Sequence, residues 1–107
     1  MSKTTLKVKN SGGFTLYIKV FGFVEDNRQK TLTTFFEYDS LTIGKSISYT
    51  LDQDQDGAQA VDPYFVVNVN GSQAEHSEVM QPMEFGKTYQ VAVAGTVCKP
   101  KFSVKKS

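Results

Sequence analysis

Leu16-Tyr17-Ile18-Lys19-Val20 is the stretch that decides the fold class of this chain, because its side chains alternate between an aliphatic and a mixed face. The aliphatic face continues to Val24, while the mixed face adds Phe21 and Phe23. A period of two is typical of a β-strand that turns one face toward a hydrophobic core. The stretch therefore predicts a strand whose second face is also partly apolar.

The same alternation recurs along the chain, between turn signals such as Asn10-Ser11-Gly12-Gly13, Glu25-Asp26-Asn27-Arg28 and Asn70-Gly71. No window shows an apolar stripe of helical period. We therefore predict an all-β fold, a single antiparallel β-sandwich of about seven or eight short strands, as one domain over residues 1–107. The predicted core positions outside the first stretch are Leu6, Val8, Leu32, Thr34, Phe36, Tyr38, Ile47, Tyr49, Leu51, Phe65, Val67, Val69, Tyr89, Val91, Val93, Phe102 and Val104.

The composition is that of a globular chain, with 39% hydrophobic residues among 107. No apolar run approaches the roughly twenty residues that a membrane-spanning helix needs. Residues 1–7 lack the apolar block of a secretory signal, so we expect a protein that is cytoplasmic or released without a classical signal peptide. Cys98 is the only cysteine, which excludes an internal disulfide.

One loop carries a calcium-like motif, Asp52-Gln53-Asp54-Gln55-Asp56-Gly57. Alternate carboxylates followed by glycine form the first half of an EF-hand loop, in which they converge on one Ca²⁺ ion. The bidentate glutamate expected at loop position twelve is replaced by Pro63. A solvated hairpin loop is the alternative, because Asp, Gln and Gly also favour turns. The predicted Ca²⁺ ligands are Asp52, Asp54, Asp56, a carbonyl near Ala58, and Asp62.

Charge is unevenly distributed, although the formal net charge is only +1. All eleven acidic residues lie between Glu25 and Glu84, and both ends of the chain carry lysine alone. If the terminal strands lie together, these lysines form a basic surface that attracts phosphate, sulfate or anionic lipid. The alternative is that they only solubilise edge strands. The lysines in question are Lys3, Lys7, Lys9, Lys99, Lys101, Lys105 and Lys106.

Enzymatic chemistry finds little support in the sequence. His76 is the only histidine, with Glu75, Glu78, Ser72 and Ser77 nearby in the chain. Nothing in the strand pattern brings a nucleophile, a base and an oxyanion site together around it. A zinc site normally needs three or four Cys or His ligands, which this chain lacks. We predict that the protein is not an enzyme.

Four aromatic residues fall on the face opposite the regular core positions: Phe21, Phe23, Phe35 and Tyr64. A packed second layer is the simpler explanation, and we expect it here. An exposed aromatic patch would instead indicate a partner, a sugar ring or a membrane surface.

Three segments carry a resemblance to a known family: Tyr89-Gln90-Val91-Ala92-Val93-Ala94-Gly95-Thr96-Val97-Cys98-Lys99-Pro100, Phe14-Thr15-Leu16-Tyr17-Ile18-Lys19-Val20 and Ile43-Gly44-Lys45-Ser46. Together they resemble the C-terminal β-sandwich domain of the cholesterol-dependent cytolysins and its stand-alone relatives. The resemblance implies an aegerolysin-like or cytolysin-domain-like sandwich, with an immunoglobulin-like sandwich as the alternative.

In that family, a Thr-Leu pair that touches sterol follows a Gly-Thr step, and here Val97 and Cys98 follow Gly95-Thr96. The tryptophan-rich loop of the family has no counterpart, because the chain contains no Trp. The resemblance implies a small sandwich that binds lipid or glycan at a surface. The ligand-binding candidates are Val97, Cys98, Lys99 and Lys101.

We therefore predict a non-enzymatic, Ca²⁺-dependent binding module that recognises a glycan or an anionic membrane surface. The alternative is a structural or self-associating sandwich without metal, and a homo-oligomer is left open. No nucleic-acid partner is expected, since no aromatic residue lies among the terminal lysines to stack on bases.

Overall fold

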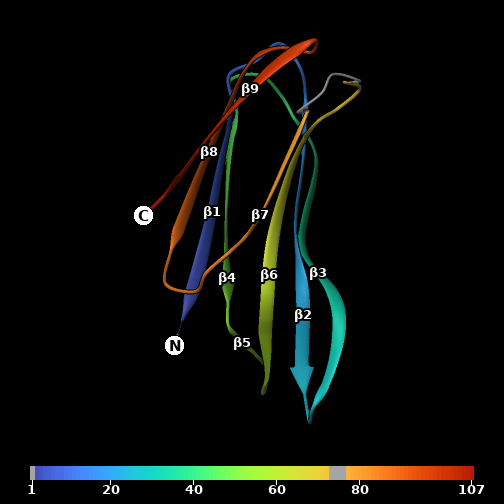
Figure 1. Ribbon diagram of the computed structural model, residues 1–107, viewed down its shortest axis with the longest axis vertical. Helices are drawn as coiled ribbons and strands as arrows, with labels where there is room; N and C mark the ends of the chain where they lie inside the picture. Colours follow the sequence, from blue (N-terminus) through green and yellow to red (C-terminus); the bar gives the residue numbers. More distant parts are fainter. Residues whose placement is uncertain (1, 73–76) are drawn as a thin grey trace.

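Nine β-strands form two sheets that pack face to face in the computed structural model, which describes residues 2–72 and 77–107 (Figure 1). Within these residues, no helix is long and apolar enough to cross a membrane. The strands are β1 (Lys3–Asn10), β2 (Leu16–Asp26), β3 (Gln29–Leu41), β4 (Ser46–Asp52), β5 (Asp54–Gln55), β6 (Ala58–Val69), β7 (Glu78–Pro82), β8 (Thr88–Thr96) and β9 (Lys99–Lys106).

Sheet A contains four strands in the order β4-β1-β8-β9. Sheet B contains β3-β2-β6, and both β5 and β7 pair with β6. The all-β sandwich predicted from the alternation is thus confirmed. The prediction of seven or eight strands fell short because the two-residue strand β5 sits inside the aspartate motif, where the sequence reads as loop.

The core lies between the sheets and consists of the alternate residues of the central strands. The period of two predicted most of it correctly, but not at Leu32, Thr34 and Tyr38, which are exposed. All three lie on β3, an edge strand whose register against β2 shifts twice. These irregularities break the alternation of faces. The buried apolar residues are Leu6, Val8, Leu16, Ile18, Val20, Leu41, Leu51, Ala60, Phe65, Val67, Val69, Met83, Tyr89, Val91 and Val93.

One strand pair departs from the predicted antiparallel arrangement, since β1 and β8 run parallel. Parallel neighbours need a long connection, because a tight turn can only join antiparallel strands. Here all the strands of sheet B and also β4 of sheet A lie between β1 and β8 in the chain, which finally crosses from β7 back to sheet A. This pairing places the N-terminal strand directly beside the C-terminal hairpin of β8 and β9.

Asn10 is fully buried at the end of β1 and ties three chain segments together. Its Nδ2 donates hydrogen bonds to the carbonyl oxygens of Phe14 and Leu41, at 2.6 and 2.9 Å. Its Oδ1 accepts one from the backbone N–H of Gly12 at 3.0 Å. The side chain thus satisfies backbone groups that the β1–β2 and β3–β4 connections would otherwise leave buried without partners.

Gly22 is the residue of β2 that lies against an irregularity of β6, where Asp62 has a φ of 51°. A Cβ at Gly22 would lie 2.9 Å from the Cα of Pro63 and 3.0 Å from the carbonyl oxygen of Asp62. Both neighbours are backbone atoms and cannot move aside cheaply. The close approach of the two strands therefore depends on glycine at this position.

We predict that Gly22→Ala lowers the free energy of unfolding by about 1–3 kcal/mol, the usual cost of overpacking a tight site. Gly13→Ala is the matched control, since a Cβ at Gly13 meets nothing within 4 Å. Urea unfolding followed by circular dichroism measures both variants. Equal stability of the two variants would contradict this view of the β2–β6 contact.

Candidate functional site

The calcium-like motif forms a β-hairpin, here called the aspartate hairpin (residues 52–58). β5 pairs with the start of β6, with Gln55 opposite Ala58, and Asp56-Gly57 makes the connection. The φ angles of Asp56 and Gly57 are 54° and 92°, both positive, as in a type I′ turn. Glycine at position 57 is thus explained by the hairpin turn itself.

Two of the motif's carboxylates cap this turn. Asp52 Oδ1 accepts a hydrogen bond from the Asp54 N–H at 3.0 Å, and Asp54 Oδ1 accepts one from the Gly57 N–H at 3.4 Å. Among residues 2–72 and 77–107, no group of three or more His, Cys, Asp or Glu side chains is placed to hold a metal ion. Binding of Ca²⁺ by the aspartate hairpin stays a prediction.

Asp62 lies away from the other predicted ligands. It is four residues beyond Ala58 along β6, a distance of about 14 Å in extended chain. Its carboxylate lies 3.9 Å from Nζ of Lys30, which is close to the turn of the β2–β3 hairpin. The structure therefore does not bring Asp62 together with Asp56.

Val97 and Cys98 form the exposed turn between β8 and β9, at the opposite end of the sandwich from the aspartate hairpin (Figure 1). The whole length of β8, roughly 27 Å, separates the two ends. The Lys99 N–H donates to Thr96 Oγ1 at 3.2 Å, which closes the turn. A single small molecule therefore cannot contact both predicted sites.

The lysines at the two ends of the sequence do come together, because β1, β8 and β9 are neighbours in sheet A. Lys7 pairs with Gln90, which pairs in turn with Lys105. Lys9 pairs with Ala92, and Lys101 pairs with Ala94. The alternation of β-strands turns all these side chains outward, away from the core. The terminal lysines other than Lys106 thus form one surface, as the first of the two sequence interpretations predicted.

We call this surface the basic face, the outer face of sheet A. Strands β1, β8 and β9 carry seven lysines, of which all but Lys106 point outward, and no acidic residue. Among the described residues, the only carboxylate on the outer face of sheet A is that of Asp52, opposite Lys3 at one end. The two ion pairs formed among the described residues, Lys30–Asp62 and Lys106–Glu84, use no lysine that points outward from this face. Its positive charge is therefore not neutralised within the described part of the chain.

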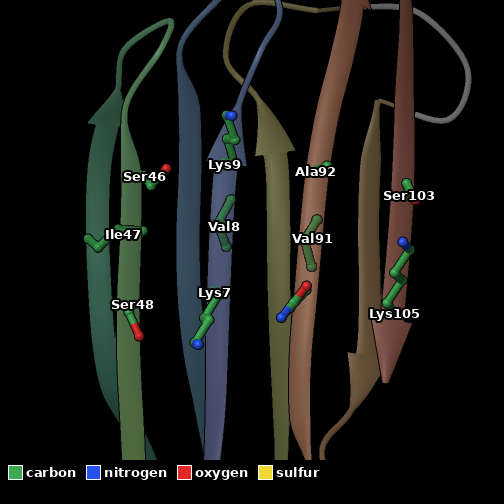
Figure 2. Close-up of a pocket in the computed structure, with 11 residues that line it drawn as sticks. Lys7, Val8, Lys9, Ser46, Ile47, Ser48, Val91, Ala92, Ser103 and Lys105 are labelled. Carbon is green, nitrogen blue, oxygen red and sulfur yellow. The ribbon is translucent and has the colours of Figure 1, made fainter. Parts of the chain in front are cut away.

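A groove of about 510 Å³ runs across the basic face (Figure 2). Lysine side chains from β1 and β9 lie on either side of β8, whose exposed Gln90 and Ala92 form the floor. Hydroxyl groups from β4 and β9 extend the lining. The outward side chains of the groove are Lys7, Lys9, Ser46, Ser48, Gln90, Ala92, Ser103 and Lys105.

Sequence reasoning missed the serines, Gln90 and Ala92 of this groove. Each of these residues lies at a polar position of an alternating strand, so the alternation does predict that its side chain points outward. The missing information was the parallel pairing of β1 with β8, which sets these residues between the lysines. The remaining sequence candidates, His76 and Glu75, lie outside the described residues.

The aromatic residues divide between the two faces of sheet B. Phe35 packs against the core, as expected from a second layer. That expectation was wrong for Phe21, Phe23 and Tyr64, which lie on the outer face of sheet B and are only partly buried. Phe21 and Tyr64 stack with ring centroids 5.9 Å apart, and Lys19 Nζ lies 5.3 Å from the Phe21 ring. Neighbouring side chains of the same sheet thus partly cover the Phe21 and Tyr64 rings.

Solved structures of toxins share this fold. A non-haemolytic pneumolysin from Streptococcus pneumoniae aligns over 98% of this chain with a TM-score of 0.61 and 14% identity. The human-specific toxin intermedilysin aligns over 98% with a TM-score of 0.58 and 12% identity. Both are cholesterol-dependent cytolysins, the family that the sequence resembles. The chain spans 24% and 23% of their respective lengths.

At these identities the similarity establishes the fold alone. No protein-family model and no curated protein sequence matches this chain.

Proposed function

We propose that this protein is a non-enzymatic binding module that attaches to an anionic membrane or glycan surface through the basic face. The observation that carries the proposal is the juxtaposition of β1, β8 and β9, which gathers unneutralised lysines from both ends of the chain onto one side of sheet A. A one-signed surface of this kind raises the local concentration of anions and speeds their association.

The structural neighbours agree with a binding role. Intermedilysin has been solved with human CD59, and pneumolysin is described as a sugar-binding protein. In both, the region of shared fold is about a quarter of a larger toxin. A sandwich of the same fold with a charged face fits attachment to a cell surface better than catalysis.

The proposal predicts salt-dependent binding. We expect the protein to bind phosphatidylserine vesicles or immobilised heparin at 50 mM NaCl, and to weaken by at least about tenfold at 300 mM, where charges are screened within a few ångströms. Vesicle sedimentation and heparin chromatography measure this dependence, with neutral phosphatidylcholine vesicles as the control. Absence of binding to both anionic probes at low salt would overturn the proposal.

The calcium prediction is tested in the same assays by comparing Ca²⁺ with chelator. Ca²⁺ held by Asp52, Asp54 and Asp56 would raise the melting temperature, because a ligand that binds only the folded protein stabilises it. Asp54→Asn keeps a hydrogen-bond acceptor for Gly57 but removes a charge, so it would abolish that rise without opening the turn. If Ca²⁺ left the melting temperature of the wild type unchanged, the calcium prediction would be wrong. Binding by the basic face would then not depend on calcium.

Self-association is the second candidate function, and the outer face of sheet B favours it. Leu32 and Met80 are 67% and 56% exposed on strands that flank the partly buried Phe21 and Tyr64. Exposed apolar side chains next to an aromatic pair are typical of contact surfaces between proteins. Sedimentation velocity of wild type and of the Leu32→Ser, Met80→Ser variant tests it: a dimer in the wild type alone would support this role.

A further inference from the structure

The groove of the basic face runs across the strands of sheet A, because its lining takes neighbouring residues from β4, β1, β8 and β9 in turn (Figure 2). Its lysines are Lys7 and Lys9 on β1 and Lys105 on β9, the two strands that flank β8. The backbone at Lys7 lies about 9.6 Å from that at Lys105, twice the spacing between paired strands, and about 7 Å from that at Lys9. The positive charge of the groove is thus spread over three separate points.

Three cations spaced in this way complement a chain of anionic groups more closely than one isolated phosphate. A single phosphate could contact only one or two of these lysines at a time. A linear polyanion that lies across the strands could approach all three lysines at once and occupy the length of the groove. The charge pattern therefore favours a polymer whose anions repeat along its axis.

The uncharged lining indicates which polymer. Serine hydroxyls both donate and accept hydrogen bonds, and so does the amide of Gln90, which suits the hydroxyl groups of sugars. Single-stranded nucleic acids bind proteins largely by stacking their bases on aromatic rings, and among the described residues no aromatic side chain lines the groove. The groove thus has the chemistry of a sugar site rather than of a base-stacking site.

A flat bilayer is a poorer match for this groove. The exposed large apolar residues among the described residues are Leu32, Tyr38, Ile43, Met80 and Val97, and none of them lies on the basic face. A membrane bound there would gain electrostatic attraction but no burial of apolar side chains. The small side chain of Ala92, by contrast, leaves room on the floor for a chain to pass between Lys9 and Lys105.

We propose that the basic face binds a linear sulfated polysaccharide, which lies in the groove across the strands of sheet A and contacts Lys7 and Lys9 on β1 and Lys105 on β9. This inference rests on the proposed function, and it names the ligand class of that same face. Sulfate groups contact the lysines, and sugar hydroxyls contact Gln90 and the serines. The floor at Ala92 sets how closely the chain approaches the sheet.

The test compares three probes on the full chain: heparin-derived oligosaccharides from disaccharide to octasaccharide, phosphatidylserine vesicles, and oligothymidine of matched charge. We expect the octasaccharide to bind at least a hundredfold more tightly than the disaccharide, because only the longer chain reaches all three lysines of the groove. We also expect it to bind more tightly than oligothymidine. Calorimetry measures the oligomers and sedimentation measures the vesicles.

The groove itself is tested by Ala92→Ile, which fills the floor without changing charge and suits a β-strand. We expect it to weaken octasaccharide binding at least tenfold, whereas vesicle binding, which needs only the lysine ends, changes less than twofold. Thr34→Ile is the matched control, since Thr34 is exposed on sheet B and lies opposite Phe21 on the outer face. It should leave both affinities unchanged, and thermal melts check that both variants are folded.

The outcomes separate the two proposals. Binding to vesicles without binding to the octasaccharide would overturn the polysaccharide inference and leave the proposed function standing. Equal affinity for oligothymidine and octasaccharide, or full octasaccharide affinity in Ala92→Ile, would also overturn the inference. Failure of all three probes would overturn both.

Discussion

Replacement of Lys7, Lys9 and Lys105 by glutamine in one variant should weaken binding to anionic vesicles and heparin by about a hundredfold. A lysine near an anionic surface contributes about 1 kcal/mol, so three lysines contribute about 3 kcal/mol. These lysines line the groove together and use no ion pair among the described residues. Their loss therefore removes attraction to the ligand and breaks no described ion pair. Equilibrium binding at fixed low salt measures the effect.

The matched control replaces Lys19, Lys30 and Lys87 by glutamine. Both variants lower the formal net charge from +1 to −2, the difference being three lysines in each case. Lys19 and Lys30 belong to sheet B, and Lys87 lies in the connection before β8. The control should keep most of the wild-type affinity, because its lysines lie off the basic face. An equal loss in the two variants would show that net charge matters and that the location of the lysines does not.

Asn10→Ala should be the most destabilising substitution of a polar residue in the described structure. It removes two donated hydrogen bonds and one accepted bond from a fully buried site. A buried backbone group that loses its partner costs about 1–3 kcal/mol, so we expect a loss of about 3–5 kcal/mol in the free energy of unfolding. Urea denaturation with an unchanged m-value would measure it.

Asn68→Ala is the control for this prediction. Asn68 lies in β6 and makes a long, exposed hydrogen bond of 3.4 Å to Glu78. Because water can replace that bond, we expect a change within about 0.5 kcal/mol. If Asn10→Ala were as mild as Asn68→Ala, the connections at that end of the sandwich would not depend on the Asn10 side chain.

The local alternation of side chains predicted the sandwich and most of its core correctly. Burial of one strand face requires an apolar residue at every second position, and this signal survives in the central strands, as at Ile18 and Val67. It fails at the edge strand β3, where shifts in register expose Leu32 and Tyr38. The conformation of an irregular edge strand depends on tertiary packing, which a period of two in the sequence does not report.

The parallel pairing of β1 and β8 could not be predicted from the local sequence pattern. Side-chain alternation records which face is buried, but it does not record which strand is the neighbour. The lysines were therefore recognised as a candidate surface, whereas the groove between them was not. Lys7 and Lys105 are at opposite ends of the sequence, and only the fold sets them on either side of Gln90.

The aspartate motif shows that one pattern can have two physical causes. Carboxylates at alternate positions suit a curling Ca²⁺ loop, but a β-hairpin also turns every second residue to one side. The dipeptide Asp56-Gly57 is itself a strong signal for a type I′ turn, and its positive φ angles fit that turn. The carboxylates of Asp52 and Asp54 accept hydrogen bonds from the backbone of the same hairpin.

Mapping the bound ligand by ¹H–¹⁵N correlation spectroscopy tests the central claim most directly. Titration of the labelled protein with a heparin-derived octasaccharide should shift the amide signals of β1, β8 and β9 around Lys7, Gln90 and Lys105. Signals from the outer face of sheet B should stay unchanged. Shifts confined to the Val97–Cys98 turn, to the aspartate hairpin or to sheet B would contradict binding through the basic face.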